Sequence, residues 1–190
     1  LQKDDWSFRR SKWFEHVGNE CLNVQDNAGL LDMTAFAKCR ISGPGAEEFL
    51  DYLVANKIPK KIGRVNLCHA LNTAGGVHSE FTIAKEKENS FYLVSAGAFQ
   101  RLDHDWIHKW MPKDGSVIYE NLTNSMGVLV LAGPKSRDIL SKITKTDLSN
   151  ENFPWLSSKK INVGLAPSIA MRMNFVGELG WELHHPIEYQ

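Results

Sequence analysis

Two glutamates in the sequence occupy positions where a carboxylate could take part in chemistry. Glu80 lies on the polar face of an alternating run, 77–84, beside His78 and Thr82, and Glu182 lies in a second such run near the end of the chain. A carboxylate can accept a proton, stabilise a developing cation or accept N–H donors from a ligand. The same spacing also fits two solvated strand faces, because glutamate is rarely buried without a partner. The residue pattern alone leaves both interpretations open.

A possible metal site lies at His104 and His108, which are four residues apart on an expected helix. The tract 104–108 approximates a zinc-protease motif, with Asp in place of Glu. At about 100° per residue, however, both histidines lie opposite the apolar stripe that contains Leu102 and Trp106. No third ligand is evident from the pattern. We therefore expect no metal at this helix.

Other signatures exclude several classes of function. No Gly-x-Gly-x-x-Gly or Gly-Lys-Ser/Thr segment follows a strand, which argues against a dinucleotide fold or a phosphate loop, and Gly-x-Ser-x-Gly does not occur. The three cysteines, Cys21, Cys39 and Cys68, are too widely spaced for a disulfide framework or a Cys-rich zinc site, and they suit a reducing compartment. The 22 Lys+Arg balance the 22 Asp+Glu, so we expect neither nucleic acid nor an anionic membrane as the main partner.

The elements that must position these residues are helices interspersed with strands. Helical spacing of apolar residues predicts helices over 11–28, 46–54 and 99–111. Alternation predicts strands over 35–42, 65–71, 77–84, 91–95, 117–122, 127–131, 169–176 and 181–185. With 43% hydrophobic residues in 190, the chain can bury one sizeable core. The sequence therefore predicts the α+β class with a largely antiparallel sheet.

The last two strands are predicted to form a hairpin around the turn 177–180. If Val176 pairs with Trp181, Phe175 lies opposite Glu182 on one face of the hairpin. This register would place an aromatic ring beside one of the two candidate carboxylates.

Residues 41–50 and 131–140, which lie 90 positions apart, share a pattern of strand, Gly-Pro corner and helix. One explanation is independent use of a favourable corner, since Gly frees the turn and Pro suits the first helical position. The other is that two similar strand–helix units pack on one sheet. Both explanations stay open at the level of sequence.

Five blocks, in order, resemble the folate-binding region shared by the glycine cleavage T-protein (aminomethyltransferase) and the C-terminal part of dimethylglycine and sarcosine dehydrogenases. The blocks are Gly-Leu-Leu-Asp-Met at 29–33, Ile-Ser-Gly-Pro at 41–44, Leu-Asn-Thr-Ala-Gly-Gly-Val at 71–77, Leu-Ala-Gly-Pro at 131–134 and Phe-Val-Gly-Glu-Leu-Gly-Trp-Glu at 175–182. The segment 7–14 and the last block look more like the flavin-linked demethylating branch than the stand-alone T-protein.

The resemblance implies the aminomethyltransferase folate-binding fold, with residues 1–190 as the N-terminal portion of such a domain and without the family's C-terminal barrel. It implies transfer of a one-carbon unit from a methylated amine, such as dimethylglycine or sarcosine, to tetrahydrofolate. By resemblance, Glu80 lies beside the reacting folate nitrogens, Glu182 accepts hydrogen bonds from the pterin, and Phe175 replaces a family tyrosine as a stacking face. The chain has Ser79 before Glu80 where the T-protein has two aspartates, and Ala96 replaces a family asparagine.

The same resemblance implies the cofactor and partners. The cofactor is tetrahydrofolate, joined by FAD only if a flavin domain precedes this module in the same polypeptide, and the chain itself is expected to be part of a longer polypeptide. The expected partners are a small-molecule donor and folate, and the expected compartment is the cytoplasm, or the mitochondrial matrix in a eukaryote. Two alternatives remain: a folate-dependent demethylase of another methylated donor, and a non-catalytic folate-binding or regulatory protein.

Overall fold

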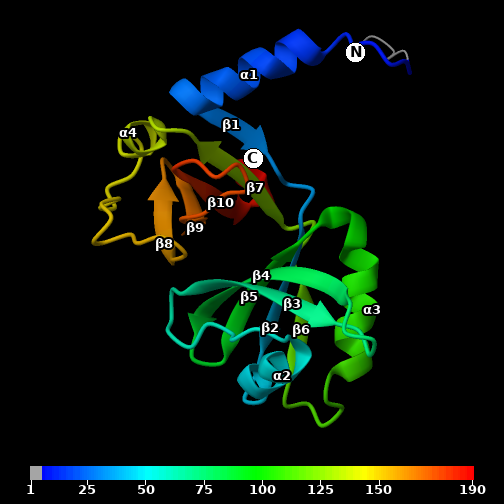
Figure 1. The fold of residues 1–190 in the computed structure, drawn as a ribbon. Coiled ribbons are helices and arrows are strands. Elements are labelled where there is room, and N and C mark those ends of the chain that lie inside the picture. The colour runs from blue at the N-terminus through cyan, green and yellow to red at the C-terminus, as the bar shows by residue number, and fades with distance from the viewer. Residues whose placement is uncertain (1–5) are drawn as a thin grey trace.

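The computed structural model describes residues 6–190, whose strands form two five-stranded sheets (Figure 1). Sheet A contains β1 (Gly29–Asp32), β7 (Met126–Ala132), β8 (Ser158–Val163), β9 (Ala166–Met171) and β10 (Gly180–Pro186). Sheet B contains β2 (Ala37–Ser42), β3 (Val65–Leu71), β4 (Val77–Lys87), β5 (Ser90–Ser95) and β6 (Ile118–Asn121). The strand orders are β1-β7-β10-β9-β8 and β3-β4-β5-β2-β6, and all pairings between these strands are antiparallel. The predicted α+β class is confirmed, with two sheets in place of one.

The helices α2, α3 and α4 pack on the outer faces of the sheets, while a separate apolar layer joins the sheets to each other. The helices are α1 (Phe14–Asp26), α2 (Ala46–Leu53), α3 (Gln100–Trp110) and α4 (Ser136–Leu140). Residues of α2 and α3 share a core with sheet B, and Leu140 of α4 shares one with sheet A. A third core brings Tyr92 and Val94 of β5 together with Met171 of β9. No helix among residues 6–190 is long and apolar enough to cross a membrane.

The two sheets repeat one topology. In sheet B, β2, α2, β3, β4 and β5 follow one another as β7, α4, β8, β9 and β10 do in sheet A. The registers agree as well, since Ile41 pairs with Phe91 and Leu131 pairs with Trp181, each residue 90 positions after its counterpart. The internal repeat is therefore structural, and its two units form two separate sheets and do not pack on one, as the second of the two open explanations had it.

The fifth strand of each sheet comes from the other unit. The strand β1 precedes β2 in the chain but pairs with β7, and β6 precedes β7 but pairs with β2. The segments 33–36 and 122–125 carry the chain from one sheet to the other. Because each unit donates a strand to its neighbour's sheet, the two units are tied together through backbone hydrogen bonds.

Most predicted elements are confirmed, and their differences from the structure have local causes. The helix predicted over 11–28 spans only Phe14–Asp26, because Gly29 already begins β1, a strand that the pattern missed together with β8. The apolar stripe predicted for α3 is only half right: Trp106 and Trp110 pack against the core of sheet B, whereas Leu102 is exposed. The buried residues of α3 are Asp103 and Ile107. Asp103 is buried because it accepts hydrogen bonds from two serine hydroxyls.

The predicted register of the last hairpin is also wrong. Glu182 pairs with Met171, so Phe175 does not lie opposite it. The strand β9 ends at Met171 and a loop, 172–179, replaces the expected four-residue turn. The Asn174 amide donates to the carbonyl of Glu178 at 2.8 Å and accepts from the backbone of Val176 at 3.0 Å, which holds the wide loop open.

Candidate functional site

A cavity of about 720 Å³ lies between the sheets, within the size range of about 300–1,000 Å³ that is typical of small-molecule sites. The three residues selected from the sequence, Glu80, Phe175 and Glu182, all line it. The remaining lining residues are Phe36, Leu67, Val77, His78, Ser79, Thr82, Val94, Ser95, Ala96, Phe99, Asp103, Trp155, Leu156, Met173 and Asn174. Fold topology therefore brings side chains of both repeats to one hollow.

Glu80 lies on β4 directly opposite His69 of β3. Its Oε2 is 2.9 Å from His69 Nε2, and the Glu80 side chain is 49% exposed. The alternation of β4 places Glu80 on the sheet face away from the helices, while the neighbouring Ser79 and Phe81 are buried. This carboxylate is open to the cavity and has one cross-strand partner on its other side.

Glu182 lies at the centre of β10 and is only 6% exposed. Its Oε2 is 3.3 Å from His184 Nε2, and within the described part of the chain its other oxygen, Oε1, has no hydrogen-bond partner. A buried carboxylate with an unpaired oxygen on a cavity wall can accept a ligand N–H, because the energetic cost of removing it from water has already been met by folding. Glu182 is therefore not on a solvated strand face.

Phe175 lies in the loop 172–179 and is 92% exposed. It reaches the cavity from the loop between β9 and β10, without a place in either strand. An exposed aromatic ring at the mouth of a cavity offers a flat apolar face to a ligand.

The sequence analysis missed Asp103, which is 4% exposed and lines the cavity from α3. Its Oδ1 accepts from Ser79 Oγ at 2.5 Å and its Oδ2 from Ser95 Oγ at 2.6 Å. The buried carboxylate of Asp103 on α3 is thus bonded to serine hydroxyls of two strands, β4 and β5. No local spacing marked Asp103, because its hydrogen-bond partners are serines of two separate strands.

The Cys39 thiol, close to Asp103, is not suited to act as a nucleophile. Burial, reinforced by the Asp103 carboxylate, raises the pKa of Cys39 to about 12. A thiol with such a pKa stays protonated near neutral pH, and nucleophilic attack requires the thiolate.

The two helix histidines make ring contacts with each other and with Tyr119. The His104 and His108 ring centroids are 3.9 Å apart, and each ring packs edge-on against Tyr119. Across residues 6–190 there is no group of three or more His, Cys, Asp or Glu side chains that could hold a metal ion.

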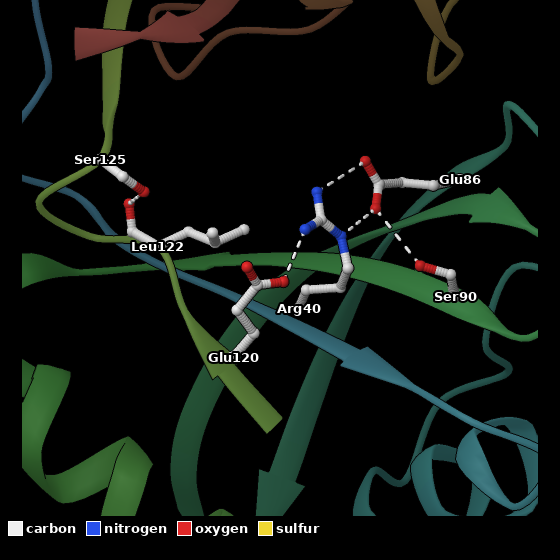
Figure 2. A network of polar contacts seen from close by, with 6 residues as sticks. All are labelled: Arg40, Glu86, Ser90, Glu120, Leu122 and Ser125. Carbon is white, nitrogen blue, oxygen red and sulfur yellow. Dashed lines mark hydrogen bonds and ion pairs between the residues drawn. The ribbon is translucent and has the colours of Figure 1, made fainter. Parts of the chain in front are cut away.

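A second cavity, of about 490 Å³, is lined by Arg40, Glu86 and His184 among others. The Arg40 guanidinium is saturated by two carboxylates: Nε is 2.7 Å from Glu86 and Nη1 is 2.7 Å from Glu120 (Figure 2). The hydrogen bond that Arg40 donates to Glu86 raises the pKa of Arg40 further above its ordinary value. Because its charge is already neutralised, this cation is not free for an anionic ligand.

Comparisons with known proteins agree with this architecture. The family described as GCVT N-terminal domain matches residues 3–190. Mitochondrial dimethylglycine dehydrogenase of Mus musculus is 39% identical over 180 residues, which cover 94% of this chain and 21% of that protein. The mitochondrial pyruvate dehydrogenase phosphatase regulatory subunit of Mus musculus is 32% identical over 186 residues, covering 96% of this chain and 21% of that protein. The chain thus spans about a fifth of the length of these relatives.

A solved structure shares the fold. The glycine cleavage system aminomethyltransferase T from Bartonella henselae superposes with a TM-score of 0.78 at 23% identity, covering 90% of this chain and 45% of that one. The predicted aminomethyltransferase fold is confirmed by this match.

Proposed function

The chain belongs to the GCVT N-terminal domain family, and from this premise we propose that the cavity between its sheets binds tetrahydrofolate and serves the transfer of a one-carbon unit from a methylated amine. The observation that carries the proposal is the meeting of Glu80 and Glu182, which come from different sheets and line one cavity. The similarity to dimethylglycine dehydrogenase supports dimethylglycine or sarcosine as the donor.

The residues of the cavity fit a reduced folate. A pterin has flat faces, which pack on an aromatic or apolar wall, and an edge of N–H donors, which bind to a carboxylate. Glu182, a buried residue, offers an oxygen without a partner and Phe175 offers an exposed ring, while Leu67, Val77 and Phe99 supply apolar surface. Charge-assisted hydrogen bonds to Glu182 would set the orientation of the ring, and stacking on Phe175 would hold its face.

Glu80 would act at the reacting end of the ligand. Tetrahydrofolate, when bound, supplies the nucleophilic nitrogen that takes up the one-carbon unit. The Glu80 carboxylate would stabilise positive charge on the donor carbon and accept the released proton on Oε1, while His69 Nε2 stays within hydrogen-bond distance of Oε2. Asp103, held by two serine hydroxyls, lines the same cavity from α3.

The wider assembly is part of the same proposal. A flavin domain elsewhere in the polypeptide would oxidise the amine, in line with the length of the dehydrogenase relatives beyond the matched region. The mitochondrial relatives favour the mitochondrial matrix if the protein is eukaryotic.

A second candidate function follows from one relative. The match to a pyruvate dehydrogenase phosphatase regulatory subunit favours a regulatory protein in which the cavity binds folate without turnover. The two functions differ in the role of Glu80. A catalytic protein needs the Glu80 charge for one-carbon transfer, whereas a regulatory protein needs only binding of the pterin.

The test is a titration of the full-length natural protein with tetrahydrofolate. Replacing Glu182 by Ala would leave pterin N–H donors unpaired in a buried site, at a cost of about 1–3 kcal/mol. We expect Glu182→Ala to raise the dissociation constant by about tenfold or more. Glu178→Gln, which removes an exposed carboxylate from the adjacent loop, is the matched control and should bind as the wild type does. Wild-type affinity in folded Glu182→Ala would exclude this site.

A further inference from the structure

Behind the candidate site, three buried side chains form a hydrogen-bonded row that crosses from one sheet to the other. Tyr92 Oη on β5 is 3.1 Å from His184 Nδ1 on β10, and His184 Nε2 is 3.3 Å from Glu182 Oε2. Tyr92 and His184 are fully buried and Glu182 is 6% exposed. The Tyr92 and His184 rings meet edge-on, with centroids 5.4 Å apart. The row therefore links sheet B to the carboxylate that sheet A presents to the cavity.

The chemistry of these groups allows one order of donors and acceptors. An ionised carboxylate only accepts, so the proton between His184 and Glu182 lies on Nε2. A neutral imidazole then has an unprotonated Nδ1, which accepts from the Tyr92 hydroxyl. Burial, the largest cause, raises the pKa of Tyr92 well above its ordinary value, so the phenol keeps the proton that it donates. Both ring nitrogens of His184 are thereby assigned.

In this order His184 holds one oxygen of Glu182, and the other, Oε1, has no partner within the described part of the chain and is left for a ligand in the cavity that Glu182 lines. Since Glu182 and His184 are two residues apart on β10, their side chains project from the same face of the strand. His184 lines the second cavity while Glu182 lines the first, so their hydrogen bond lies in the wall between the two cavities. A hydrogen bond at one oxygen restrains rotation of the Glu182 carboxylate before a ligand arrives.

We propose that His184 and Tyr92 are positioning residues, which hold the Glu182 carboxylate in the orientation that a pterin edge requires. This role rests on the proposed folate site. It differs from a merely structural joint between the sheets, which would affect the stability of the protein and not the affinity of the folded protein for its ligand.

The first test does not depend on folate. In nitrogen-15 spectra of the histidine-labelled protein, with His184 assigned by its loss in His184→Gln, Nδ1 should give a pyridine-type signal and Nε2 a pyrrole-type signal. In Tyr92→Phe the pyridine-type signal should shift, because its donor is gone. A His184 protonated on Nδ1 alone would overturn the proposed order.

The second test measures tetrahydrofolate affinity, together with kcat at saturating folate, in the full-length protein. Tyr92→Phe should weaken binding by about two- to tenfold, the net effect of one hydrogen bond, and His184→Phe by about tenfold or more. His184→Gln, whose side-chain amide can donate to Glu182 from nearly the same place, should restore affinity to within about threefold of the wild type. The value of kcat should stay unchanged throughout. The matched control is Tyr119→Phe, whose ring contacts His104 and His108.

The outcomes separate this proposal from the function on which it rests. A wild-type protein that does not bind tetrahydrofolate overturns the proposed function and this role with it. If the wild type binds and Glu182→Ala weakens binding, but folded His184→Phe keeps wild-type affinity and loses only thermal stability, the positioning role alone is overturned. If His184→Phe does not fold, the affinity of Tyr92→Phe, which lacks a single oxygen, is the deciding measurement. Wild-type affinity in that variant overturns the positioning role.

Discussion

Glu80 and Glu182 differ in how their side chains meet solvent, and this difference assigns them different tasks. The Glu80 side chain is 49% exposed and pairs with His69, whereas the Glu182 side chain is 8% exposed and pairs with a buried histidine. A solvated carboxylate keeps the freedom to exchange protons, and a buried one offers stronger fixed hydrogen bonds. This difference supports the proposed division of tasks, with proton and charge handling at Glu80 and recognition of the pterin at Glu182.

Replacing Glu80 by Gln keeps the shape of the side chain and removes its charge. If that charge stabilises a cationic one-carbon unit, transfer to tetrahydrofolate should slow by ~10²-fold or more, while folate affinity changes little. In a flavin-linked full-length enzyme, amine oxidation should continue and formaldehyde should leave in place of methylene-tetrahydrofolate. Both products are followed with excess tetrahydrofolate, using Glu88→Gln in the exposed β4–β5 turn as the control. An unchanged product ratio would return Glu80 to an ordinary solvated strand position.

Lys38 is a buried amine on β2 whose effect depends on pH. It is 1% exposed, its Nζ donates to the Thr34 carbonyl at 2.7 Å, and burial lowers the pKa of Lys38 from 10.5 to about 8. The folded value lies below the unfolded one, so between these two pH values the folded state binds fewer protons and stability rises with pH. Below that window both states are protonated and the penalty is complete.

Removing the amine should remove this pH dependence. From pH 7.5 to 10.5, the free energy of unfolding of the wild type should rise relative to that of Lys38→Met by up to roughly 3 kcal/mol. Urea unfolding at several pH values measures the difference, and Lys113→Met, at an exposed lysine, should follow the wild type. Parallel curves for the wild type and Lys38→Met would show that burial of this amine costs nothing.

At the scale of elements, the sequence predicted what local pattern determines. The helix α2 and the strands β3 and β5 follow from the spacing of apolar residues, with bounds within two residues of the structure. The short strand β1 has no such signal, because a four-residue strand needs a partner, here β7, to define it. The hairpin register could not be predicted because residues 172–179 form a loop, in which the Asn174 side chain bonds the backbone, and Glu182 pairs with Met171.

The candidate site, too, could be predicted from the sequence only in part. Family resemblance indicated Glu80, Phe175 and Glu182, and the cavity unites them. Asp103 could not be found from apolar periodicity, because its burial depends on two serine hydroxyls from β4 and β5. Polar contacts between distant strands leave no mark in local sequence spacing.

The repeated Gly-Pro corner gives an element-scale prediction. Gly133 has a φ of +122°, and a Cβ there would lie 2.6 Å from the carbonyl oxygens of both Asn27 and Val24. Gly133→Ala should therefore lower the free energy of unfolding by about 3 kcal/mol or more, through backbone strain and overpacking together. Gly164→Ala, at a φ of +58° with nothing within 4 Å, carries only the strain and should cost about 1 kcal/mol. Equal losses in denaturant unfolding would show that the close approach at Gly133 relaxes freely.

At the scale of the whole molecule, the site depends on two repeats being held against each other. Glu80 belongs to sheet B and Glu182 to sheet A, and the strands β1 and β6 cross between the units. An isolated bridge, Arg64 to Ser157, adds a backbone link just before β3 and β8. Exchanged strands, the apolar layer and the Tyr92–His184 hydrogen bond together keep the two glutamates facing one cavity.

The most direct test is a crystal structure of the full-length protein with bound tetrahydrofolate. Our account predicts the pterin between the sheets, with its N–H edge on Glu182, its ring against Phe175 and its reacting nitrogens toward Glu80. Tetrahydrofolate bound in the cavity beside Arg40, or anywhere out of contact with both glutamates, would contradict it.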